Sequence, residues 1–118
     1  MALPFEPGDD LIFQLESGYG LLRVLAKEAE GRDTVWHLLA YEELFPDTES
    51  AEQSLRTGSL HVWQAHLPLT DRAFERTPAA KLGNRTVTKD ELIPVNAWRE
   101  SSSRRVHDRS ALLLLGLR

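Results

Sequence analysis

Five acidic side chains fall within eleven consecutive positions of the sequence: Glu42, Glu43, Asp47, Glu49 and Glu52. Carboxylates that are concentrated on one face attract a basic protein and can imitate the phosphate backbone of a nucleic acid. The same residues would also serve ordinary solubility, and the sequence leaves both interpretations open. We expect a protein-binding surface here, with Tyr19 either adding a contact or covering the edge of a sheet.

A basic segment near the end of the sequence combines one aromatic and four arginine side chains: Trp98, Arg99, Arg104, Arg105 and Arg109. Arginines beside an aromatic ring can bind phosphate and stack on a base. Two acids interrupt the segment, the sequence pI is near 5.5, and no known nucleic-acid-binding motif is present. A nucleic-acid-associated accessory protein is therefore the alternative function, and a solvated loop is the plainer interpretation of the segment.

The residue types that usually carry catalysis or bind metals do not form a recognisable site. The four histidines lack the spacing of a helical zinc motif, and His61 and His66, five positions apart in an expected strand, point to opposite faces. Adjacent acids such as Asp9 and Asp10 are separated in the same way and do not form an acid–base pair. We expect no metal, no cofactor and no catalytic residue, and hence a binding protein rather than an enzyme.

The turn that contains Gly18 and Gly20 does not match a phosphate-binding loop. It lacks the third glycine of a dinucleotide-binding loop and the lysine of a P-loop, and it joins two expected strands rather than a strand and a helix. The two glycines are better explained by the backbone freedom that a tight hairpin needs.

Alternation of apolar and polar residues predicts three antiparallel strands at 11–16, 21–29 and 34–45. A short helix is expected over 47–57, because Asp47 or Ser50 can cap its start and Gly58 can end it. A further strand is expected at 59–69. The apolar run 111–115 fits a buried final strand, and a helical turn is the alternative.

These elements predict an α+β fold with a strongly bent antiparallel sheet or a partly open SH3-like barrel, and two or three short helices. The apolar side chains of the strands should form its core: Leu11, Phe13, Leu15, Leu22, Val24, Val35, Leu39, Val62 and Trp63.

The chain of 118 residues has the length of a single domain, 1–118, and a composition typical of globular proteins, with 42% hydrophobic and 27% charged residues. Cysteine is absent, which excludes disulfides and thiolate metal sites. The first ten residues lack the basic start of a signal peptide, and no apolar run approaches the ~20 residues of a membrane span. We expect a cytoplasmic protein that does not bind membranes.

Part of the first quarter of the chain resembles a known family. The pattern consists of Pro7-Gly8-Asp9, the strand with Phe13 and Leu15, the turn Gly18-Tyr19-Gly20 and the strand Leu22-Arg23-Val24-Leu25. This pattern is similar to the N-terminal signature of small bacterial immunity proteins of polymorphic-toxin systems, which also occurs in SH3-like β-meanders. The resemblance implies a non-catalytic protein that neutralises a toxin by binding it, and it assigns no functional residue.

Overall fold

Three antiparallel strands joined by tight turns form the first part of the structure, as the apolar alternation predicts. The computed structural model describes residues 3–116, and its first strands are β1 (Asp9–Leu15), β2 (Gly18–Glu30) and β3 (Asp33–Phe45). Gly18, the first residue of β2, has a φ of 143°, and a Cβ atom there would lie 2.4 Å from the carbonyl oxygen of Phe45. The turn before β2 therefore requires glycine for backbone reasons, and its interpretation as a hairpin is confirmed.

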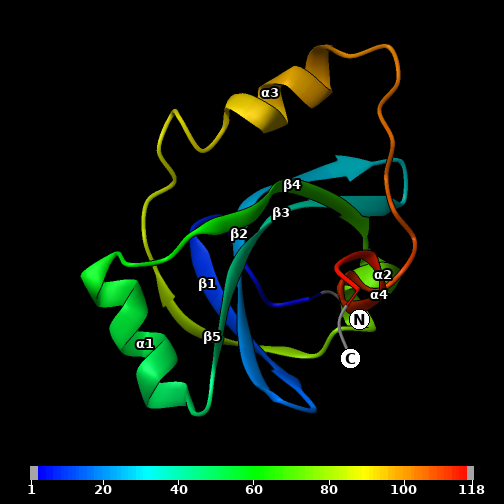
Figure 1. Ribbon diagram of the computed structural model, residues 1–118. Helices are drawn as coiled ribbons and strands as arrows, with labels where there is room; N and C mark the ends of the chain where they lie inside the picture. Colours follow the sequence, from blue (N-terminus) through cyan, green and yellow to red (C-terminus); the bar gives the residue numbers. More distant parts are fainter. Residues whose placement is uncertain (1–2, 117–118) are drawn as a thin grey trace.

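Short helices and two more strands follow the meander (Figure 1). The predicted helix is confirmed as α1: the Asp47 side chain accepts a hydrogen bond from the backbone N–H of Ser50, and Gly58 ends the helix in the left-handed conformation. The described elements after β3 are α1 (Thr48–Thr57), β4 (Val62–Thr70), α2 (Asp71–Glu75), β5 (Ala79–Asn84), α3 (Ile93–Glu100) and the single turn α4 (Ala111–Leu114).

The five strands form one sheet in the order β4-β3-β2-β1-β5, and every neighbouring pair is antiparallel. The predicted α+β class with an antiparallel sheet and short helices is thus confirmed. The expected strong bend or barrel closure is wrong, because β4 and β5 lie at opposite ends of the sheet and do not pair. A barrel buries one face of its sheet, whereas here both faces of β2 are buried from Gly20 to Ala26, so other segments cover the sheet on both sides.

Each face of the sheet has its own core. One face carries the largest cluster, in which Phe13, Leu22 and Leu38 pack against Phe74 of α2 and Ala111 of α4. Figure 1 shows α2 and α4 side by side against the sheet.

The opposite face carries two smaller clusters. Ile12 and Leu21 pack against Ala51 of α1, and Leu25 and Leu39 pack against Val95 of α3. The two helices thus cover different parts of this face, and polar side chains fill the space between the two clusters.

The expected core is confirmed except at two positions. Val62 and Trp63 were expected in the core but are 51% and 42% exposed, because they lie at the start of an edge strand. The other predicted core residues are buried, namely Leu11, Phe13, Leu15, Leu22, Val24, Val35 and Leu39. The run near the end of the chain forms the helical turn α4, the alternative to a buried strand. Among the described residues, no helix has the length and apolar character needed to cross a membrane.

Candidate functional site

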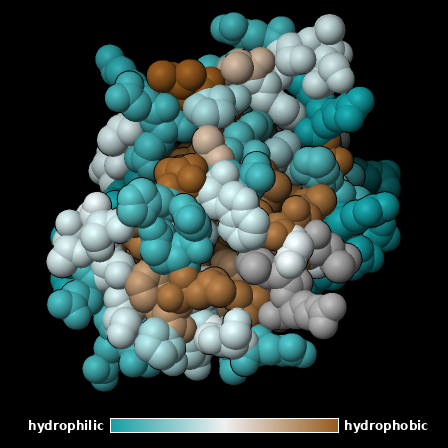
Figure 2. Space-filling view, viewed as in Figure 1, coloured by the Kyte–Doolittle hydropathy of each residue, from teal (hydrophilic) through white to brown (hydrophobic). Residues whose placement is uncertain are grey.

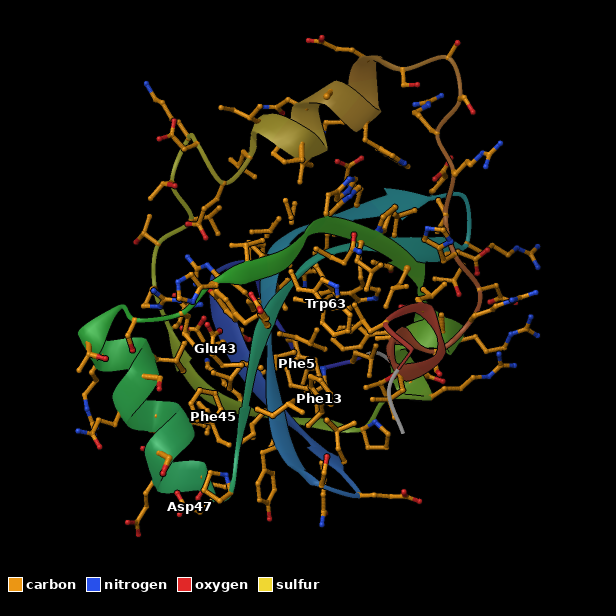
Figure 3. All side chains as sticks on the ribbon, in the orientation of Figure 1. Phe5, Phe13, Glu43, Phe45, Asp47 and Trp63 are labelled. Carbon is orange, nitrogen blue, oxygen red and sulfur yellow. The ribbon has the colours of Figure 1, made fainter. Side chains whose placement is uncertain are left out.

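The predicted acidic residues follow the end of β3 and the length of α1, and Figure 3 shows Glu43 and Asp47 on this path. Glu42 and Glu43 belong to β3, Asp47 caps α1, and Glu49 and Glu52 belong to α1 itself. All except the half-buried Glu43 are exposed. The structure therefore places these five carboxylates along one connected strand-and-helix segment.

Tyr19 lies beneath this segment rather than on it. It pairs with Phe45 across β2 and β3, is half-buried, and packs in the core cluster under α1. β2 is an interior strand of the sheet, so Tyr19 does not cover a sheet edge, and its contact with a partner stays a prediction.

Glu43 is held in place by His61, which lies just before β4. The Glu43 carboxylate accepts the His61 backbone N–H at 2.8 and 3.0 Å and contacts the His61 Nδ1 atom at 2.6 Å. Desolvation alone would raise the pKa of Glu43, but these hydrogen bonds outweigh it and leave the pKa lowered. The same hydrogen bond raises the pKa of His61. The pair fixes the start of β4 against the end of β3.

Three potential metal ligands, the side chains of Glu42, Glu43 and His61, lie within 4.8 Å of one another. Carboxylate and imidazole groups suit several divalent cations. The hydrogen bonds between His61 and Glu43 already account for the position of two of the three side chains, so the cluster has a structural explanation without an ion.

Exposed apolar side chains adjoin these carboxylates. Val62 and Trp63, the first residues of β4, line a surface hollow together with Glu42. Figure 3 labels Trp63 beneath β4 and Glu43 beside β3, and Figure 2 shows apolar residues among the polar surface of the same view. Aromatic residues at a surface are typical of protein interfaces, which makes this junction the candidate binding surface.

The predicted basic segment is divided between α3 and the loop that follows it. The Trp98 indole N–H donates to the carbonyl oxygen of Arg105 at 2.9 Å, and the Arg104 guanidinium lies 6.0 Å from the centre of the Trp98 ring. Arg99 is instead paired with Glu28 of β2, and Arg109 is exposed in the loop. The structure thus joins three of the five residues.

The ring of Trp98 is largely occupied within the protein. It packs edge-on against His37 and His66, with ring centres 4.8 and 6.3 Å away. His37 and His66 are stacked and joined by a hydrogen bond of 2.8 Å between Nδ1 and Nε2. These edge-on contacts hold the Trp98 ring in place within the protein.

Sequence reasoning missed a buried ionic cluster between the two smaller cores. Arg23 of β2 donates to Glu91 at 2.6 Å and to Asp10 of β1 at 3.3 Å, and Arg85 donates to the same Asp10 at 2.6 and 2.8 Å. Asp9 and Asp10 are buried, although their sequence suggested solvated charge.

The pKa values in this cluster follow from the ion pairs. Burial opposes the charges of both Arg23 and Glu91, but their mutual hydrogen bonds outweigh burial, raising the pKa of Arg23 and lowering that of Glu91. Alternation along β2 correctly puts Arg23 on the face opposite Leu22 and Val24. Arg23 is buried only because segment 85–91 covers it, and nothing in the sequence around Arg23 predicts this burial.

Comparisons with known protein families, with curated proteins and with solved structures found no match to this chain.

Proposed function

We propose that this chain is a non-catalytic protein-binding module that binds a basic partner through the acidic segment of β3 and α1. The resemblance of its first quarter to immunity proteins, an SH3-like meander signature, extends the proposal to a toxin as that partner. The single observation that carries the proposal is the junction of exposed Val62 and Trp63 with the carboxylate of Glu42 in one hollow.

The electrostatics support a basic partner. Within residues 3–116, the exposed carboxylates of Glu42, Glu49 and Glu52 form no ion pair inside the protein. They remain available to speed and orient the approach of a positively charged surface, while a buried aromatic contact supplies the larger part of the affinity.

The test is capture of the partner from the native cells followed by mass spectrometry, with three forms of the protein. The wild type and Glu75→Lys, which reverses an exposed acid on α2, should capture the same basic protein. The double variant Glu42→Lys/Glu49→Lys should capture at least tenfold less, and added salt should weaken the wild-type complex. Undiminished capture by the double variant would remove this surface from consideration.

The alternative is a nucleic-acid-associated protein that uses Trp98, Arg99, Arg104, Arg105 and Arg109. All four of these arginines are exposed, and this supports the alternative. The same capture experiment separates the two functions: retained RNA or DNA that is lost with Arg104→Ala/Arg105→Ala would favour the alternative over a protein partner.

A further inference from the structure

The strand β4 ends the sheet, and its outer edge is covered for only part of its length. The loop after α3 pairs with the second half of β4: the His107 N–H donates to the Pro68 carbonyl at 2.9 Å, and the Thr70 N–H donates to the His107 carbonyl at 3.1 Å. Within the described part of the chain, no backbone segment bridges the outer edge at residues 62–66. The edge therefore accepts a strand-like segment in one half and leaves the other half open.

The open half carries neither of the residues that most often block an edge strand, although its register against β3 shifts twice between Leu38 and Tyr41. Natural edges are commonly blocked by lysine or proline, and the strand at the other end of the sheet, β5, carries Lys81, whose side chain is 51% exposed. Residues 62–66 read Val-Trp-Gln-Ala-His and contain neither lysine nor proline. Two of them, Val62 and Trp63, are the exposed apolar residues of the candidate surface.

Two hollows adjoin the open edge, and Val62 lines both. Glu42 lines one and Leu39 the other, and an odd separation along β3 puts these two side chains on opposite faces of the sheet. The first is lined by Glu42, Val62 and Trp63. The second, of about 240 Å³, lies toward α3 and is lined by Leu39, Val62, Ala65, Asp90, Glu91 and Pro94. Each hollow combines apolar walls with a carboxylate that forms no ion pair among the described residues, Glu42 in one and Asp90 in the other.

Successive side chains of an extended segment point to opposite sides, so a strand added along this edge would send alternate side chains into the two hollows. We propose that the partner contributes a basic, extended segment that adds to the sheet beside residues 62–66. This inference rests on the proposed protein-binding function and specifies how the partner is held. A second copy of this chain fits less well, because the carboxylates beside one edge would face those beside the other.

The probe is an eight-residue peptide of alternating valine and lysine, together with two versions N-methylated on one or the other set of alternate amides. Each methylated version keeps the charge and loses the hydrogen-bonding capacity of one edge. Binding to ¹⁵N-labelled protein is followed by NMR. We expect the backbone amides of 62–66 to shift, their hydrogen exchange to slow at least tenfold, and at least one methylated peptide to bind at least tenfold more weakly.

Two variants with the same charge change locate the binding edge. Ala65→Lys alters β4 and Ala80→Lys alters β5, and both positions are exposed. We expect Ala65→Lys to weaken peptide binding at least fivefold and Ala80→Lys to leave it unchanged, with both variants showing native spectra.

Equal binding of all three peptides, or shifts that leave 62–66 unchanged, would overturn strand addition. The proposed function would survive that result if Glu42→Lys/Glu49→Lys still abolished partner capture. The two proposals can therefore fail separately.

Discussion

Replacing Arg23 with methionine would remove the centre of the buried ionic cluster while keeping a long side chain in its place. The Arg23 side chain is only 2% exposed, so water cannot take over its hydrogen bonds. Besides the carboxylates of Asp10 and Glu91, it donates to the carbonyl oxygens of Gly8, Arg85 and Thr86 at 3.0, 3.0 and 3.3 Å.

The loss in the free energy of unfolding depends on which acceptors have no other strong donor once Arg23 is replaced. Asp10 keeps Arg85, the Gly8 carbonyl keeps the Arg85 backbone N–H at 2.9 Å, and Glu91, 23% exposed, can rehydrate. Two backbone carbonyls, at 85 and 86, are left without Arg23. At about 1–3 kcal/mol for each of these two unsatisfied carbonyls, we expect a loss of about 2–6 kcal/mol.

Urea unfolding followed by tryptophan fluorescence and circular dichroism measures this loss, which is large beside the ~5–15 kcal/mol stability of a typical domain. Arg32→Met is the matched control, because Arg32 is exposed in the turn between β2 and β3 and should change the free energy of unfolding by less than about 0.5 kcal/mol. A loss below about 1 kcal/mol for Arg23→Met, with an unchanged urea slope, would refute the reasoning that the cluster holds segment 85–91 on the sheet.

The remaining predictions concern the first hairpin and the histidine pair. Gly18→Ala should destabilise the protein by about 1–3 kcal/mol because of the positive φ at this position and the clash with the Phe45 carbonyl. Gly83→Ala is the control and should not destabilise the protein, because nothing lies within 4 Å of the new Cβ atom. Equal urea midpoints for the two variants would contradict this prediction. Burial, with repulsion from His37, lowers the pKa of His66 from 6.5 to about 4. The unfolded chain therefore binds more protons between these pH values, and stability should fall by about 1–2 kcal/mol as pH drops through them, after allowance for solvent screening. Urea unfolding across this range should show a flatter pH dependence for His66→Gln, and an unchanged one would argue against His66 as the titrating group.

The meander and the first helix could be predicted because their signals are local. Alternation along β1 to β3 reports which side chains share a face, and Asp47 and Gly58 act on the backbone within one helical turn. The acidic segment was likewise visible, since it is continuous in the sequence. The exposure of Trp63 could not be predicted, because the local sequence of a strand does not show whether its edge pairs with another strand or faces solvent.

The basic segment shows a second limit. Trp98 and its arginines look like a nucleic-acid-binding group in the sequence, but in the fold the ring packs on His37 and His66, more than thirty positions away. Such a contact depends on where α3 lies over the sheet, and the sequence around Trp98 does not predict that position.

Four features could be predicted from the amino-acid sequence: the α+β class, the antiparallel meander, the glycine-dependent hairpin at Gly18 and the concentration of carboxylates from Glu42 to Glu52. These features arise from backbone sterics, side-chain alternation and composition, which act over a few residues. Three other features emerge only from the folded chain: Asp10 and Arg23 are buried, the sheet stays open, and the first half of β4 has a free edge. Each of these depends on which distant segment covers a surface, and the energy of such coverage is shared by residues far apart in the chain.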